Sequence, residues 1–399
     1  MQILVLNSGS SSLKFQLFSM PEETILCSGL IERIGFDDAK FKFKTDKNTI
    51  EVVESIPNHK VGLELLSKQL LDKEKGIIKS ADAIDIVGHR VVHGGKHFSN
   101  TTEITEAVKE KIKALSSLAP LHNPANLEGI EVAEAIFPNA KQVAVFDTAF
   151  HQSIPEHAYK YAIPNEFLEK HHIRLYGFHG TSHKFVSEKA IEFLGKEHSK
   201  IITIHLGNGC SMTAIKDGKS IDHTLGFSPV NGLIMGTRSG DIDQSIIFHL
   251  AEKFNYSFKE INNILQKKSG MLGLTGFSDL RDIQAEAEKG NKDCQLALQM
   301  NAYRIKKYIG SYAAVLNGLD AIVFTAGIGE NSPEMRRRVC EDLDYLGITL
   351  DSEKNQVRPD KLTVISTEDS KVKVLVIPTN EELEIAKQAM SLVLPKTIG

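Results

Sequence analysis

Three short stretches rich in small residues each follow an apolar run, and they contain the groups that most readily bind an anion. Residues 7–14 (NSGSSSLK) offer an amide, four hydroxyls and a lysine, whereas 207–212 (GNGCSM) and 325–332 (TAGIGENS) offer glycine-flanked backbone. Exposed backbone N–H groups can surround a phosphate, and glycine allows it to come close. For the first stretch alone, a serine-rich hairpin with an exposed lysine is an equally good interpretation. Together the three stretches predict a phosphate-binding protein.

Two familiar nucleotide motifs are excluded around residue 210. A dinucleotide fingerprint requires a helix after its glycine loop. Here Asp217-Gly218 lies between two short strand-like runs, 214–216 and 219–221, which predicts a β-hairpin. The letters GKS at 218–220 resemble the end of a Walker A motif, but the first glycine of that motif would fall on Thr213. The remaining interpretation is a strand–loop–strand phosphate cradle, like the one at the N-terminus.

Two arginines lie in glycine-rich surroundings where a buried charge needs a partner. Arg90 lies at the end of a strand-like run (GHRVVHGG), and Arg238 lies in MGTRSGDID. A guanidinium binds a carboxylate or phosphoryl group through two parallel hydrogen bonds, and its burial is unfavourable without an anion. Both arginines are therefore candidate anion-binding residues. For Arg238 the alternative is a structural ion pair with Asp241 or Asp243.

Asp147 follows the apolar residues of VAVF. A carboxylate at the end of a buried strand is often a functional group that binds a metal or orients a reacting group. The alternative is a turn cap shared with Thr148.

The histidines do not predict a zinc site. His89, His93 and His97 are four residues apart, but Val91-Val92 and Gly94-Gly95 disfavour a helix. In a strand, residues four apart are separated by about 13 Å, too far to share one zinc ion. His179 and His183 (GFHGTSH) are likewise separated by a glycine.

Three signatures occur twice in the same order, and they predict the elements that position these groups. Residues 3–18 match 202–220, 81–95 match 318–332, and 141–150 match 372–382. Each pair contains a buried strand that runs into polar or glycine-rich residues, and amphipathic stretches such as 105–119 lie between them. A further helix is expected from Asn380. We therefore expect two related α/β domains, although strands and glycine turns alternate in any α/β chain.

The composition agrees with this class. The chain has 399 residues, which favours two domains, and 41% hydrophobic and 25% charged residues are typical of a globular protein in water. The net charge of −4 argues against a nucleic-acid binder, and no apolar run reaches the roughly 18 residues of a membrane span. No signal peptide is recognisable at the N-terminus. Four separated cysteines fit reduced thiols, so we expect a cytoplasmic protein: Cys27, Cys210, Cys294 and Cys340.

Taken together, the motifs resemble the acetate kinase family. The matching pieces are LNSGSSSLKF, GHRVVHGG, PLHNP, FDTAFH, YGFHGTSH, HLGNG, GFSPVNGLIMGTRSGDID, GFSDLRD, TAGIGENS and PTNEEL, in the family's order over nearly the whole chain. The resemblance implies an α/β fold of two duplicated actin-like (ribonuclease H-like) domains with a βββαβαβα core and an interdomain cleft. The implied domains are 1–150, with a C-terminal helix at about 383–399 packed on it, and 151–382. The family also implies ATP and ADP as co-substrates, Mg²⁺ with Mn²⁺ as a substitute, and a homodimer.

The resemblance also assigns roles to individual residues. Asn7 and Glu381 would hold the metal, and Arg90 would bind the substrate carboxylate. Asp147 would be the active-site carboxylate with His122 nearby, and His179 and Arg238 would stabilise the transition state. The substrate methyl group would lie among Val92, Leu121, Phe178 and Pro229. The nucleotide would be bound by Lys14, His205, Leu206, Gly207, Asn208, Gly209, Asp279, Leu280, Arg281, Gly327, Ile328, Gly329, Glu330 and Asn331.

His223, Asn231 and Gln244 depart from what the family leads us to expect, namely threonine, glutamate and proline. The expected reaction is direct in-line transfer of a phosphoryl group from ATP to acetate. Propionate kinase is the alternative within the family, and Val92 beside Arg90 favours the shorter acid. A nucleotide-cycling ATPase of the actin or chaperone type is the alternative from another class, but it would not need the two arginines.

Overall fold

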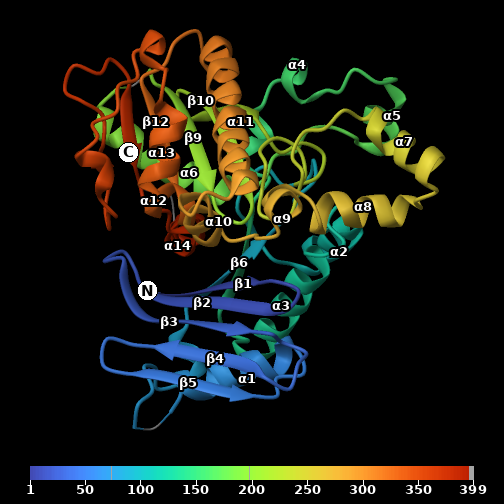
Figure 1. Cartoon of the computed structure of the whole chain (residues 1–399). Helices are drawn as coiled ribbons and strands as arrows, with labels where there is room; N and C mark the ends of the chain where they lie inside the picture. Colours follow the sequence, from blue (N-terminus) through green and yellow to red (C-terminus); the bar gives the residue numbers. More distant parts are fainter. Residues whose placement is uncertain (73, 197, 395–399) are drawn as a thin grey trace. The chain divides into compact units, whose positions relative to one another are not determined.

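The structure is a computed structural model that describes residues 1–72, 74–196 and 198–394. The chain divides into two compact units (Figure 1). Unit 1 combines Met1–Phe150 with the C-terminal segment from Asn380, and unit 2 comprises His151–Thr379.

Unit 1 contains an eight-stranded mixed sheet in the order β5-β4-β3-β2-β1-β6-β8-β7. β1 pairs antiparallel with β2 and parallel with β6, and β6 pairs parallel with β8. The carboxyl ends of β1, β6 and β8 therefore meet at one edge of the sheet. The strands are β1 (Gln2–Ser8), β2 (Ser12–Ser19), β3 (Thr24–Glu32), β4 (Ala39–Lys44), β5 (Thr49–Glu54), β6 (Ile86–Val91), β7 (Thr102–Glu103) and β8 (Lys141–Phe146).

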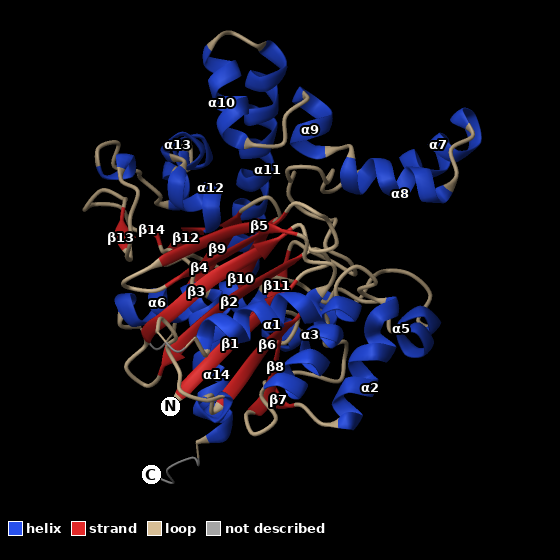
Figure 2. Ribbon diagram, turned by 90° about the horizontal axis from the view of Figure 1, so that it is seen from below, coloured by secondary structure: helices blue, strands red, loops and turns tan. Residues whose placement is uncertain are grey.

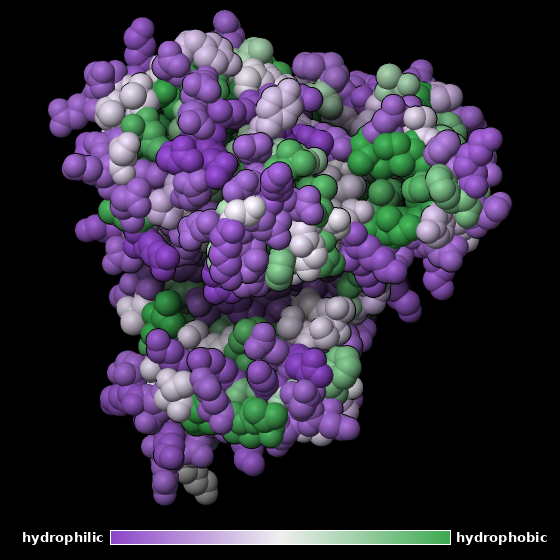
Figure 3. Space-filling model, in the orientation of Figure 1, coloured by the Kyte–Doolittle hydropathy of each residue, from purple (hydrophilic) through white to green (hydrophobic). Residues whose placement is uncertain are grey.

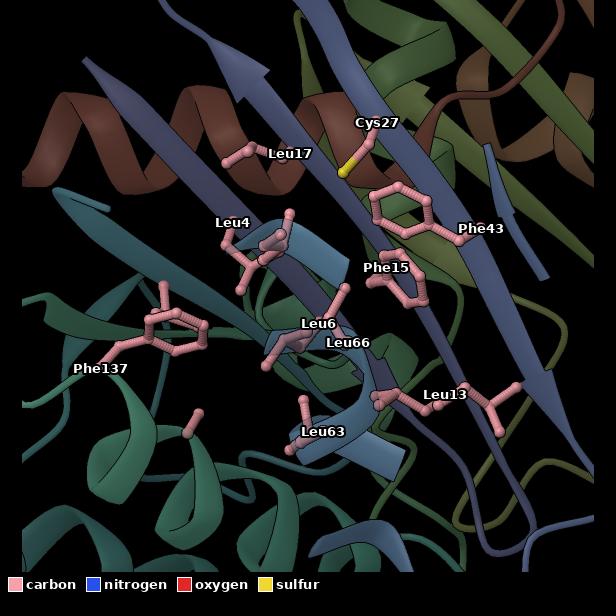
Figure 4. Close-up of a cluster of buried hydrophobic side chains, with 14 of the residues drawn as sticks. Leu4, Leu6, Leu13, Phe15, Leu17, Cys27, Phe43, Leu63, Leu66 and Phe137 are labelled. Atoms are coloured by element: carbon pink, nitrogen blue, oxygen red, sulfur yellow. The ribbon is translucent and has the colours of Figure 1, made fainter. Parts of the chain in front are cut away.

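Helices cover both faces of this sheet, which explains why Ile3 to Leu6 in β1 are all apolar and buried. Leu4 and Leu6 belong to a core cluster that also contains Leu63 of α1 (Figure 4). On the other face, Gly88 lies so close to α14 that an added Cβ would come within 2.9 Å of Ile385. The helices of unit 1 are α1 (His59–Leu70), α2 (Glu106–Ala114), α3 (Asn123–Ile136) and α14 (Glu381–Val393), with 3₁₀ turns at Ala81–Ala83 and Leu115–Ser117.

Unit 2 repeats the same topology. Its sheet runs β11-β10-β9-β12-β14-β13, with β9 antiparallel to β10 and parallel to β12, and with β12 parallel to β14. β9, β12 and β14 thus correspond to β1, β6 and β8, so the predicted duplication is confirmed (Figure 2). The strands are β9 (Lys200–Leu206), β10 (Cys210–Lys216), β11 (Lys219–His223), β12 (Ala321–Thr325), β13 (Thr363–Val364) and β14 (Lys373–Val376).

The helices of unit 2 include α11, which is 25 residues long and packs on α9, α10, α13 and the sheet. α6 contacts β9 and β12. The helices are α4 (Glu156–Tyr159), α5 (Glu166–His171), α6 (Gly180–Leu194), α7 (Ser245–Phe254), α8 (Phe258–Lys267), α9 (Gly270–Thr275), α10 (Leu280–Glu288), α11 (Lys292–Leu316), α12 (Ala326–Asn331) and α13 (Pro333–Cys340); 3₁₀ turns lie at Phe150–Ser153, Asp344–Leu346 and Lys354–Gln356. Within the described ranges, no helix has the length and apolar character that a membrane span requires.

α3 begins at Asn123, whose side chain hydrogen-bonds the backbone of His93, and His122 is its N-cap. One local prediction needs correction. The glycines of 325–332 lie inside the short helix α12 rather than in a loop, and Ser332 then caps α13. The predicted hairpin at Asp217-Gly218 and the helix that follows Asn380 are both present.

Candidate active site

The carboxyl ends of β1, β6 and β8 bring four predicted site residues of unit 1 together. Asn7 lies near the end of β1, Arg90 near the end of β6, Asp147 directly after β8, and Glu381 at the start of α14. Arg90 donates from Nε to Asp147 Oδ1 over 3.2 Å and from Nη1 to Asn7 Oδ1 over 3.1 Å. A second, very short hydrogen bond joins Nη2 to Asp147 Oδ2, and Glu381 Oε2 lies 3.8 Å from Nε. We call these four residues the Arg90 cluster.

The Arg90 cluster is rich in buried negative charge. Burial raises the pKa of Glu381, and the charges of Asp147 and Glu382 raise it further, against the lowering effect of Arg90 and Lys14. Lys14 forms an ion pair of 2.8 Å with the buried Glu382. Burial also opposes the charge of Arg90, but the carboxylates outweigh it and raise its pKa. Carboxylate and amide oxygens around a buried excess of negative charge are suited to a hard divalent cation.

The serine-rich connection between β1 and β2 is held by groups outside it. Asn126 of α3 donates to the Ser8 carbonyl over 2.7 Å and accepts from Val92 N, so it ties the connection to the end of β6. The His59 ring lies 2.7 Å from the Gly9 carbonyl. Ser10 and Ser11 remain exposed. These contacts hold the connection at residues 9–11 in place, with the hydroxyl groups of Ser10 and Ser11 exposed.

In unit 2, His179 and Arg238 approach the same glycine. A Cβ placed on Gly209 would lie 3.4 Å from His179 Nε2 and 3.8 Å from Arg238 Nη1. His179 is the N-cap of α6, with a left-handed backbone, and its ring stacks on His205 at 4.4 Å. The two residues predicted to stabilise the transition state therefore both lie beside Gly209, which has no side chain to separate them.

Arg238 does not form the alternative ion pair. Its Nη1 donates to the Pro229 carbonyl over 2.8 Å, and among the described residues no carboxylate lies within ion-pair distance of it. Asp241 instead accepts a hydrogen bond from Tyr308, and Asp243 accepts from Ser245. Burial lowers the pKa of Arg238 below its ordinary value. A half-buried guanidinium without a carboxylate is suited to receive an anion from outside.

A cavity of about 710 Å³ in unit 2 collects most of the predicted nucleotide residues. It is lined by Gly207, Asn208, Asp279, Leu280, Arg281, Gly327, Ile328 and Asn331. The remaining predicted residues of unit 2 do not line it: His205, Leu206, Gly209, Gly329 and Glu330. Glu330 instead accepts hydrogen bonds from Ala326 N and Thr379 N, which is a structural role.

The residue-level prediction missed part of this cavity. The wall also includes Ile234, Met235 and Gly236. These residues precede Arg238 in a glycine-flanked apolar run, a pattern from which they could have been predicted. Arg358 also lines the cavity, but it lies in an exposed segment without any motif.

The residues predicted to surround the substrate methyl group differ in exposure. Val92 and Phe178 are buried, Pro229 is half-buried, and Leu121 is 58% exposed. His122 is half-buried at the N-terminus of α3.

His223, which departs from the family expectation, is buried in unit 2 and hydrogen-bonded there. Its Nε2 accepts from Phe178 N over 3.2 Å, and its Nδ1 lies 2.8 Å from Thr213 Oγ1. Asn231 and Gln244 are exposed, and Gln244 is the N-cap of α7. His223 therefore supports the backbone of a predicted substrate residue.

A sequence profile described as the acetokinase family matches residues 2–387. The chain belongs to the acetokinase family. It is 66% identical to the acetate kinase of Flavobacterium johnsoniae over 98% of this chain and 99% of that protein. It is 54% identical to the acetate kinase of Caldanaerobacter subterraneus subsp. tengcongensis, again over 98% and 99% of the two chains. The predicted family is thus confirmed.

Solved structures of acetokinase relatives share the fold. The crystal structure of Porphyromonas gingivalis acetate kinase aligns with a TM-score of 0.94 at 46% identity, over 98% of this chain and all of that one. A propionate kinase from Francisella tularensis aligns with a TM-score of 0.92 at 44% identity, over the same shares. The fold of this acetokinase is therefore shared by proteins named for two different acids.

Proposed function

We propose that this protein is an acetate kinase, which catalyses ATP + acetate ⇌ ADP + acetyl phosphate by direct in-line phosphoryl transfer. Full-length membership in the acetokinase family, with 66% identity to a named acetate kinase, is the observation that carries the assignment. Acetate is already an anion, so it needs no general base. The chemical problem is the repulsion between a carboxylate and a triphosphate, and positive groups and backbone N–H groups reduce it.

In this proposal the Arg90 cluster binds the acceptor. Arg90 binds the acetate carboxylate, and Asp147 orients the guanidinium through the two hydrogen bonds described above. The methyl group lies against Val92, with Leu121, Phe178 and Pro229 as further contacts and His122 nearby. The proposal requires that His179 and Arg238 of unit 2 reach the same phosphoryl group, where their N–H groups would stabilise the charge that develops during transfer.

Asn7 and Glu381 are proposed to hold Mg²⁺, for which Mn²⁺ can substitute. The oxygen donors fit a hard cation, and the raised pKa of Glu381 reflects a buried negative charge that such an ion would relieve. When bound, the metal would neutralise charge on the nucleotide phosphates. Lys14, paired with Glu382, lies beside this site and would add positive charge for the phosphates.

The cavity of unit 2 is proposed to bind ATP or ADP, in a nucleotide-binding domain of the actin-like type. Gly207, Gly327 and the start of α12 present backbone, and Asp279 and Arg281 lie at the rim for the nucleoside. Asp279 and Arg281 also pair with each other, so they form one polar unit.

Acetate is preferred over propionate because Val92 follows Arg90 by two residues and is only 6% exposed. One extra methylene changes discrimination by about 1–3 kcal/mol, so some activity with propionate is expected. The test is purified protein with ATP, Mg²⁺ and formate, acetate, propionate or butyrate, measured as acyl hydroxamate. A higher kcat/KM for propionate would favour propionate kinase, and ATP turnover that does not depend on any acid would favour a nucleotide-cycling ATPase.

A homodimer is proposed, with its contact on α7 and α8. Every residue of α7 is exposed or half-buried, and Figure 3 shows apolar residues gathered over these helices. Phe248, Phe254 and Phe258 are 58%, 61% and 69% exposed, respectively, and a surface of this kind favours association. Light scattering after chromatography tests this: the protein should be dimeric and Phe248→Glu monomeric. We also propose a cytoplasmic location, which the four buried free cysteines and the proposed metabolites support.

A further inference from the structure

Three buried polar side chains of unit 2 form a chain of hydrogen bonds that ends at the half-buried His179. Thr203 Oγ1 of β9 lies 2.7 Å from His183 Nδ1, and His183 Nε2 lies 2.7 Å from Ser211 Oγ of β10. Ser211 Oγ lies 2.8 Å from His179 Nδ1. Thr203, His183 and Ser211 are each 0% exposed. The alternation in ITIHL and CSMTAI thus places polar residues on a face that is covered by α6 and not by solvent.

The position of the protons along this chain follows from the Thr203 hydroxyl. Among the described residues, His183 Nδ1 is the hydrogen-bond partner of Thr203 Oγ1 and no other is found. If Thr203 accepted from Nδ1, its own O–H would be buried without an acceptor, which is unfavourable. Thr203 therefore donates to Nδ1, and the proton of a neutral His183 lies on Nε2.

The direction then continues to His179. His183 Nε2–H donates to Ser211 Oγ, so the Ser211 O–H can donate to His179 Nδ1. A ring whose Nδ1 accepts a hydrogen bond carries its proton on Nε2. His183 stays neutral because burial lowers its pKa well below the ordinary value, and the nearby His151, His205 and His179 lower it further.

We infer that Thr203 and His183 are positioning residues for His179, and that through Ser211 they hold its ring neutral with the proton on Nε2. That nitrogen faces the Gly209 backbone beside Arg238. This rests on the proposed function, in which His179 contacts the transferred phosphoryl group: it then acts there as an N–H donor, and Arg238 supplies the positive charge. Protonation of His179 Nδ1 would require Ser211, His183 and Thr203 all to reverse.

In unit 2, the charged and titratable groups that face the rings of His179 and His183 come from four segments. The His205 ring of β9 stacks on the His179 ring. The ring centres of His151 and of His223 in β11 lie 5.9 Å and 5.2 Å, respectively, from the ring centre of His183. The fourth segment contributes Arg238 beside Gly209. His151 and His205 also oppose a positive charge on His183, whose pKa they lower.

The test compares Thr203→Val, which removes the hydroxyl and keeps the shape, with Thr203→Ser, which keeps the hydroxyl. Histidine-labelled protein is examined by ¹⁵N NMR, and His179→Gln identifies the His179 signals among the 15 histidines. The wild type and Thr203→Ser should show an unprotonated Nδ1 and a protonated Nε2 at pH 7. Thr203→Val should show a mixture of tautomers, and Ser211→Ala, set against Ser211→Thr, gives an independent pair if Thr203→Val is unstable.

Kinetics supply the second readout. In Thr203→Val, kcat should fall roughly three- to tenfold with KM for ATP and acetate unchanged, as expected for one lost hydrogen bond. The acid limb of the pH dependence of kcat should also move to higher pH in Thr203→Val. In the wild type, protonation of His179 Nδ1 reverses the hydrogen bonds and leaves the Thr203 hydroxyl buried without an acceptor. Valine has no hydroxyl, so this cost is absent in the variant. An imidazolium or Nδ1–H form of His179 in the wild type, or identical NMR spectra of Thr203→Val and wild type, would overturn the inference. If the tautomers respond as expected but no acid is phosphorylated, the relay stands and the proposed function fails.

Discussion

Replacing Arg90 by alanine should destabilise unit 1 as well as weaken acetate binding. The Asp147 side chain is 1% exposed and Arg90 is its bidentate partner, so the variant removes this ion pair from a buried carboxylate. Removing one partner of such a pair costs about 3–5 kcal/mol. In a domain of this size each kcal/mol lowers Tm by about 2–4 °C, so the transition of unit 1 should fall by roughly 6–20 °C.

The matched control is Arg238→Ala. Because Arg238 has no carboxylate partner among the described residues, its removal leaves no orphaned charge, and stability should stay within about 1 kcal/mol of the wild type. The kinetic effects should be opposite in kind. Arg90→Ala should chiefly raise KM for acetate, whereas Arg238→Ala should lower kcat by about 10²–10³, the usual effect of losing a group that stabilises developing charge.

Calorimetry and steady-state kinetics, the latter well below each melting temperature, give the two readouts. Arg90→Ala combined with Asp147→Asn should recover part of the lost stability, because the amide carries no charge, and should not recover acetate binding. The reasoning is refuted if Arg90→Ala and Arg238→Ala melt alike, or if Arg90→Ala retains the wild-type KM for acetate.

Three further predictions concern unit 2. Burial raises the pKa of Asp222 to about 6. The stability contributed by the protonated carboxyl is therefore fully present below pH 4 and is lost as the pH rises through 6. In urea titrations, Asp222→Asn should exceed the wild type in stability by roughly 3 kcal/mol at pH 8 and equal it near pH 4. Gly236→Ala should raise KM for ATP several-fold at unchanged KM for acetate, because the new Cβ would lie 2.1 Å from Asn208 Oδ1 at the cavity wall. Arg336→Met should lower the free energy of unfolding by about 3–5 kcal/mol, measured by chemical denaturation. Arg336 is 0% exposed and donates to four backbone carbonyls and to the Asn355 side chain. A loss below about 1 kcal/mol would contradict its role in joining α12 to residues 355–357.

The parts of the fold that could be predicted are those with a local cause. Apolar runs that end in polar or glycine residues identified β1, β6 and β8 and their counterparts, because a strand buried on both faces must be apolar throughout. Their order in the chain then indicated the duplication. The extent of α12 could not be predicted, because its two glycines disfavour a helix. Side chains hold it instead: Glu330 accepts from Ala326 N, and Arg336 of α13 donates to the Gly329 carbonyl.

The site shows the same division between local and distant causes. The types of Arg90 and Asp147 indicated anion and metal chemistry, but their mutual pairing depends on the parallel register of β6 and β8, which no pattern within either strand contains. The burial of the polar residues of β9 was harder to predict. Alternation such as ITIHL normally indicates a solvent-facing side, and only the docking of α6 buries Thr203 and His205.

Duplication explains how one fold can supply two kinds of binding edge. In both units the strand topology brings the carboxyl ends of three parallel strands together, so that edge is where functional residues must lie. Unit 1 fills it with charged side chains, Arg90, Asp147 and Glu381, whereas unit 2 fills it with glycine-rich backbone at 207–209 and 326–329. Side-chain charges suit a small carboxylate and a metal ion, which need a few strong contacts, and backbone N–H groups suit a polyphosphate, which needs many. The two edges therefore differ in the kind of anion that they suit, and the difference arises from residue type alone because the topology is the same.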